Sequence, residues 1–215
     1  MFLMTLTDLS VASVILPAVV GLLCFQRLTT SLKVLFLLVV LGCAVEYAIE
    51  YGVPSIDISG VSLFIYIIYT LVEFLLVSLF YYLLAKESWF QKVIFWGGIA
   101  YICFFFGMLT SSADILSNFG YLAAVESVFL VLWVVLYFRQ IILYQIDMNL
   151  KVSPTFWIST GFLLYFLGTF FLFAIFGLLV KNQELAAKVY EYIHSILHIT
   201  LNLLICIGFY FSTRN

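Results

Sequence analysis

Charged residues are scarce in this chain of 215 residues, since Lys, Arg, Asp and Glu together make up only 9% of it. A typical soluble domain contains roughly 25% of these residues. So few charges do not cover the surface of a water-soluble protein in which 66% of the residues are hydrophobic. Disorder is excluded as well, because disordered chains are poor in aromatic residues, which make up 19% here. The composition therefore predicts an integral membrane protein.

Basic residues are few, and the 9 Lys and Arg against 11 Asp and Glu give a formal net charge of −2. The electrostatic field that attracts nucleic acid requires a basic surface, so nucleic acid is not an expected partner. The 4 cysteines lie in different hydrophobic runs and form no Cys-x-x-Cys pair. This spacing gives no sign of a disulfide framework.

Long hydrophobic runs recur between short polar breaks, and each is close to the roughly 20 residues that a helix needs to cross a bilayer. The runs are unbroken rather than alternating, which favours helices over barrel strands. The sequence thus predicts an all-α, polytopic membrane bundle of seven transmembrane helices, forming one domain over residues 1–215. The spans are expected at about 9–25, 34–52, 61–84, 90–109, 116–138, 155–180 and 189–211.

Proline and glycine mark the breaks and the candidate kinks. Pro54 is expected to end the second span, and Pro154 to open the sixth as its first helical residue. Pro17 in the first span and Gly97-Gly98 in the fourth are positions where a helix can kink. The first span is expected to stay as an uncleaved helix, because no Lys or Arg precedes it as in a signal peptide.

The basic residues predict the orientation of the bundle, because cytoplasmic loops of membrane proteins carry an excess of Lys and Arg. Two of the nine, Lys181 and Lys188, lie on one side of the predicted spans. The N-terminus is therefore expected outside and the C-terminus in the cytoplasm. The seven residues on the predicted cytoplasmic side are Arg27, Lys33, Lys86, Lys92, Arg139, Lys151 and Arg214.

Ionisable residues within the spans are functional candidates, because a charge at the bilayer centre costs at least about 2.5–3.5 kcal/mol on insertion scales. Lys and Arg lie only near the ends of spans, so the intramembrane groups are carboxyls and imidazoles. These groups include more acids than bases. Protonation of the carboxyls, a carboxylate–imidazolium pair or a bound cation would each avoid an uncompensated negative charge in the membrane. The six candidates are Glu46, Glu50, Glu73, Glu126, His194 and His198.

The six candidates share a depth, between the bilayer midplane and the outer surface in the predicted orientation. His194, His198 and Asn202 are four residues apart and occupy one face of the seventh helix. Polar groups that faced lipid would be left without partners, so we expect one outward-open pocket lined by the second, third, fifth and seventh spans. Its expected ligand-binding residues are Glu46, Glu73, Glu126, His194, His198 and Asn202. The alternative is that these residues only join helices, at about 0.6–2 kcal/mol for each hydrogen bond.

A metal site is a sharper hypothesis for the same residues. The His-x-x-x-His spacing of His194 and His198 presents two imidazoles to one ion, and Glu73, Glu126 or Glu46 would complete a zinc site. Residues 194–198 (HSILH) resemble the seven-helix membrane zinc hydrolases of the alkaline ceramidase and adiponectin-receptor superfamily. That resemblance implies a zinc-dependent hydrolase acting on lipid. The superfamily also has a third His and an Asp in its site, whereas this chain has 2 His and no Asp well within a span.

A second resemblance covers the last third of the chain. Residues 154–161 (PTFWISTG) and 193–204 (IHSILHITLNLL) resemble seven-helix bacterial membrane proteins that are similar to the membrane sensor parts of histidine kinases. This resemblance implies a receptor-like module in a bacterial inner membrane, coupled to a histidine kinase or another signalling protein. The leading expectation is a sensory protein that binds a small ligand, a proton or a metal ion. A zinc hydrolase and a small transporter remain the alternatives.

Overall fold

The computed structural model describes residues 5–49, 59–110, 115–144, 149–179 and 183–213. Within the helices, side chains are described over 5–49, 64–110, 120–144, 154–173, 188–189 and 191–213. The regular elements in these ranges are all helical, and seven of the helical stretches are long and apolar enough to cross a membrane. The prediction of an all-α bundle with seven transmembrane helices is confirmed, and the chain is a multi-pass membrane protein.

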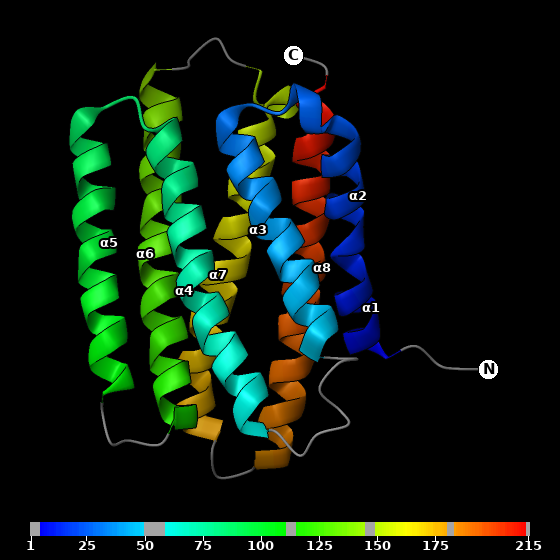
Figure 1. Cartoon of the computed structure of the whole chain (residues 1–215), viewed down its shortest axis with the longest axis vertical. Coiled ribbons are helices and arrows are strands. Elements are labelled where there is room, and N and C mark those ends of the chain that lie inside the picture. The colour runs from blue at the N-terminus through cyan, green and yellow to red at the C-terminus, as the bar shows by residue number, and fades with distance from the viewer. Residues whose placement is uncertain (1–4, 50–58, 111–114, 145–148, 180–182, 214–215) are drawn as a thin grey trace.

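The helices run roughly along one direction, side by side (Figure 1). We call the end at which α1, α4, α6 and α8 begin the lower end of the bundle, and the opposite end the upper end, as in Figure 1. Short 3₁₀ turns follow α2 and precede α7. The elements are α1 Leu6–Ser13, α2 Ile15–Cys24, η1 Phe25–Arg27, α3 Thr30–Tyr47, α4 Ser59–Leu84, α5 Ser88–Leu109, α6 Ile115–Tyr144, η3 Leu150–Val152, α7 Pro154–Leu179 and α8 Gln183–Phe211.

The first span is divided into two helices, and Pro17 is the cause. Proline has no backbone N–H, so the carbonyl of Ser13 loses its partner four residues along the chain. Accordingly α1 ends at Ser13 and α2 begins at Ile15. The Cys43 thiol of α3 donates to the Val14 carbonyl oxygen at this break, over 3.4 Å. The helix is therefore interrupted one turn before the proline.

The other break positions behave differently. Pro154 is the first residue of α7, as expected, but α5 runs through Gly97 and Gly98 without interruption. A side chain at Gly97 would overlap the ring of Trp133 on α6, so this glycine serves close helix packing instead of a kink. Pro54 and the predicted end of the second span lie outside the described residues.

The fifth span continues past its predicted end at residue 138, since α6 reaches Tyr144. The extra residues begin with a polar pair, Arg139 and Gln140. Gln140 donates to the Leu84 carbonyl and accepts from the Lys86 amide, at the end of α4 and just after it. The predicted span ends at residue 138, before this polar pair, but these hydrogen bonds satisfy the Gln140 side chain and the helix continues.

An ion pair between Arg139 and Glu87 lies at the same upper end of the bundle. Glu87 accepts from Tyr144 over 2.6 Å and from Arg139 over 3.1 Å, while the Arg139 guanidinium lies 5.1 Å from the centre of the Trp89 ring. The hydrogen bond from Tyr144, followed by the contacts with Trp89 and Arg139, holds the pKa of the Glu87 carboxyl below its ordinary value. These contacts fix the α4–α5 connection on the end of α6.

Fully buried aromatic side chains fill the upper half of the bundle between α4, α5, α6, α7 and α8. Trp133 donates to Ser78 over 3.2 Å, and Tyr81 donates to Ser159 over 3.0 Å, so the polar atoms of these rings are paired. The largest of these rings are Trp133, Tyr81, Phe80, Phe90, Phe162 and Phe209. This half of the bundle is a packed core.

Adjacent glycines in α5 give a matched test of this packing. A Cβ at position 97 would lie 2.5 Å from the Trp133 ring, whereas a Cβ at position 98 would meet nothing within 4 Å. Because Trp133 is fully buried and cannot swing away, we expect Gly97→Ala to destabilise the protein by about 1–3 kcal/mol. Gly98→Ala is expected to be neutral or slightly stabilising, because alanine favours helix.

The measurement is the melting temperature of each purified variant in detergent micelles. A Gly98→Ala variant that melts at least as low as Gly97→Ala would contradict the assigned contact between α5 and Trp133.

Candidate functional site

A cavity of about 280 Å³ lies in the lower half of the bundle, in contrast to the packed upper half. Its walls come from α1, α3, α4, α6, α7 and α8. The lining combines carboxyl, imidazole and hydroxyl groups with aromatic rings. The residues are Thr7, Ser10, Val11, Glu46, Tyr66, Tyr69, Thr70, Glu73, Ala123, Glu126, Ser127, Tyr165, Phe166, Thr169, Phe173, His194, Ser195 and His198.

Five of the six predicted ligand-binding residues line this one cavity, although they come from four helices that are far apart in sequence. The five are Glu46, Glu73, Glu126, His194 and His198. They lie toward the lower end, opposite the described basic residues near Arg27, Lys86 and Arg139. Glu50, the remaining ionisable candidate within the predicted spans, lies outside the described residues.

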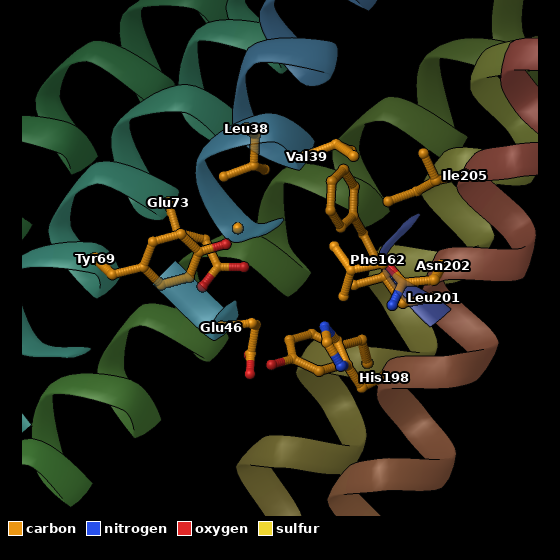
Figure 2. Close-up of a pocket in the computed structure, with 13 residues that line it drawn as sticks. Leu38, Val39, Glu46, Tyr69, Glu73, Phe162, His198, Leu201, Asn202 and Ile205 are labelled. Carbon is orange, nitrogen blue, oxygen red and sulfur yellow. The ribbon is translucent and has the colours of Figure 1, made fainter. Parts of the chain in front are cut away.

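The sixth predicted residue, Asn202, lines an adjoining cavity of about 50 Å³. The two cavities share Glu46, Glu73 and His198 among their walls. Figure 2 shows the Glu46 side chain between Glu73 on α4 and His198 on α8. Asn202 is thus one turn beyond the larger cavity, and its amide takes part in helix pairing.

Hydrogen bonds join the first helix to the last along one edge of the cavity. The hydroxyl of Thr7 donates to Glu191 over 2.5 Å, and Ser10 Oγ lies 3.0 Å from Nδ1 of His198 in a hydrogen bond. One turn further on, the amide of Asn202 donates to the hydroxyl of Ser13 over 2.8 Å. We call these three contacts the α1–α8 ladder.

The α1 side of this ladder was not predicted from the sequence, because the candidates were the ionisable residues of the spans together with Asn202. Thr7, Ser10 and Ser13 are three residues apart, which places them on one helix face. That spacing within a hydrophobic run is a signal from which a polar face can be inferred. The Ser13 hydroxyl also donates to the Ser10 carbonyl over 2.6 Å, so it is satisfied on both sides.

The sixth predicted span, which is α7, also contributes to the cavity wall, and the predicted pocket did not include it. The Tyr165 hydroxyl lies 3.3 Å from Nε2 of His194, and its ring packs against both imidazoles. The two imidazole rings stack with their centres 5.9 Å apart. Tyr165 therefore sets the position of the histidine pair at the wall of the cavity.

Glu126 differs from the other polar groups of the cavity. Its side chain is buried, with 4% of the residue exposed, and its Oε1 atom has no hydrogen-bond partner among the described residues. A buried polar atom without a partner costs about 1–3 kcal/mol, and more if the group is charged. The structure therefore leaves one carboxyl oxygen at this cavity unsatisfied by the protein.

The predicted zinc ligands are near one another but do not form a ligand set. His194, His198 and Glu73 all line the larger cavity. Among the described residues, however, no group of three or more His, Cys, Asp or Glu is placed so that it could hold a metal ion. The geometry does not fit the three-ligand zinc site that the sequence suggested.

The pair formed by Ser13 and Asn202 gives a test of the α1–α8 ladder. In hydrocarbon an interhelical hydrogen bond contributes about 0.6–2 kcal/mol, so a double-mutant cycle with Ser13→Ala and Asn202→Ala is expected to show coupling of that size. The measurement is the free energy of unfolding of both single variants and the double variant in micelles. Additive effects, with no coupling energy, would show that the two side chains do not interact.

Comparison of the chain with protein-family models, with curated proteins and with solved structures gives no match. The two resemblances noted from the sequence therefore stay predictions, and the function has to be argued from the site itself.

Proposed function

We propose that the protein is a receptor-like sensory protein of a bacterial inner membrane, with its N-terminus outside. In this proposal the larger cavity opens outward and binds a small ligand. Ligand binding changes the conformation of the bundle, and a cytoplasmic or membrane partner, such as a histidine kinase, detects this change. The basic residues at the upper end of the bundle support the orientation, because they would then face the cytoplasm.

The observation that carries the proposal is the unpartnered carboxyl oxygen of Glu126 at the wall of a 280 Å³ cavity. Residues that only join helices are expected to be paired with one another, as Ser13 is with Asn202. A buried carboxyl group that lines a cavity, with one oxygen that no described residue binds, has instead the arrangement expected of a ligand-binding site. The cavity volume lies just below the roughly 300–1,000 Å³ typical of small-molecule sites.

The α1–α8 ladder supports a signalling role for the same cavity. His198 contacts both the cavity and Ser10, so an occupant that moves the imidazole also acts on α1. The first span is interrupted at Val14, between α1 and α2. Since α8 extends from the cavity to the upper end (Figure 1), a shift of this helix would reach the proposed cytoplasmic face.

A small transporter is the second candidate, and the divided first span favours it. Interrupted helices near the middle of the membrane often border the substrate site of transporters, and Val14 lines the smaller cavity here. The lipid hydrolase receives less support, because the described residues do not assemble its zinc ligands.

Filling the cavity tests the proposed function. Ala123 is buried at the cavity wall, so Ala123→Phe is expected to occupy the space where a ligand would bind. We expect a screen of small polar compounds to raise the melting temperature of the wild-type protein by a few degrees for at least one compound class. The same compounds should leave Ala123→Phe unchanged.

The milder Ala123→Leu variant provides the comparison if phenylalanine prevents folding. Compounds that stabilise the wild type and the filled variants equally would contradict ligand binding in this cavity. Uptake of a stabilising compound into liposomes that contain the protein would favour the transporter over the sensor.

A further inference from the structure

We infer that the ligand of the larger cavity is a small organic ammonium ion, whose N–H groups donate to the carboxyl of Glu126 and to its neighbours. This inference rests on the proposed function, since it names the chemical class of the ligand for the same cavity. Four independent properties of the lining lead to it: its charge, its hydrogen-bonding groups, its aromatic rings and its size.

The ionisable side chains of the lining are carboxyls, imidazoles and phenols. Glu46, Glu73 and Glu126 all line the cavity, and none of the described lining residues is Lys or Arg. The nearest groups able to carry positive charge are His194 and His198 themselves, which are already hydrogen-bonded to Tyr165 and Ser10. A cationic ligand would supply the positive charge that the described lining residues do not provide through Lys or Arg.

Three hydroxyl groups of the lining are arranged as acceptors. Thr70, Ser127 and Thr169 each donate their hydrogen to the carbonyl four residues earlier on their own helix, over 2.7–2.9 Å. A hydroxyl that has used its hydrogen in this way can only accept a further bond. Together with the unpartnered Oε1 of Glu126, these groups make the cavity rich in acceptors, and an acceptor-rich site selects a donor.

Aromatic side chains make up much of the remaining lining. Five rings contribute to the wall, and the faces of such rings attract organic cations by about 0.5–2 kcal/mol each when the cation is desolvated. A neutral donor such as an amide would gain less from the same rings. The five aromatic residues are Tyr66, Tyr69, Tyr165, Phe166 and Phe173.

The size of the cavity separates an organic cation from a metal ion. At about 280 Å³ the space is much larger than one dehydrated ion fills, and the described residues include no group of three ligands close enough to bind one. An ammonium group that carries a small apolar substituent would use both the acceptors and the rings.

Benzylammonium and benzyl alcohol are nearly matched in shape and differ in charge, so they make a direct test. We expect purified protein in micelles at pH 7 to bind benzylammonium at least about tenfold more tightly than benzyl alcohol, as measured by calorimetry. Glu126→Gln keeps the shape of the side chain but removes its charge, and should weaken benzylammonium binding about tenfold or more. If Glu126→Gln does not fold, Glu73→Gln at the same cavity replaces it.

Glu87→Gln is the matched control, because it removes one carboxyl at the upper end of the bundle, near the end of α6. Thirteen residues of α6 separate Glu126 from Arg139, the partner of Glu87, which corresponds to about 20 Å along the helix. This variant should bind benzylammonium as the wild type does.

The outcomes separate the two proposals. Equal binding of benzyl alcohol and benzylammonium, abolished for both by Ala123→Phe, would refute the ammonium inference and leave the ligand-binding cavity intact. Unchanged benzylammonium affinity in Glu126→Gln would likewise refute the inference. Failure of both probes to bind would overturn the inference, while the compound screen described above decides the proposed function separately.

Discussion

The hydrocarbon core of a bilayer offers no hydrogen-bond partner, and this constraint governs where every polar side chain of the bundle lies. Most of the polar groups inside the spans meet it by pairing with another helix. Trp133 with Ser78 and Asn202 with Ser13 are examples at different depths. Among the described residues, Tyr101 and Glu126 each keep one buried polar atom without a hydrogen-bond partner. Of these two, Glu126 lines the larger cavity, and for this reason the functional argument centres on it.

The same constraint divides the bundle into two unlike halves. In the upper half, aromatic rings fill the space between the helices and their few polar atoms are paired. In the lower half, carboxyl groups and imidazoles surround open space, and the first span breaks at Val14 where Pro17 removes a hydrogen bond. One bundle thus combines a packed half with a half that contains a cavity. The α1–α8 ladder then links the site to the helix that crosses both halves.

Hydropathy was sufficient to predict the seven spans, because the length of an apolar run is a property of the sequence alone. The clustering of Glu46, Glu73, Glu126 and the histidines was also within reach, since depth follows from position along each helix. The partners of Ser10 and Tyr165 were not, because they depend on which helices become neighbours: Ser10 contacts His198 on the last helix, and Tyr165 contacts His194 on the helix that follows its own. The continuation of α6 past Gln140 was missed for the same reason, since the partners of Gln140 lie at the end of α4 and just after it.

Neighbouring positions on α6 allow the central claim to be measured directly. Ser127 lines the cavity and is 1% exposed, whereas Val128 is 52% exposed on the lipid-facing surface. In a chain whose four cysteines are replaced by alanine, Ser127→Cys and Val128→Cys would each be treated in intact cells with a cationic, membrane-impermeant methanethiosulfonate. The account predicts modification of Cys at position 127 and none at position 128. A reactive thiol at position 128 with an unreactive one at position 127 would contradict a water-filled, outward-open cavity that admits cations.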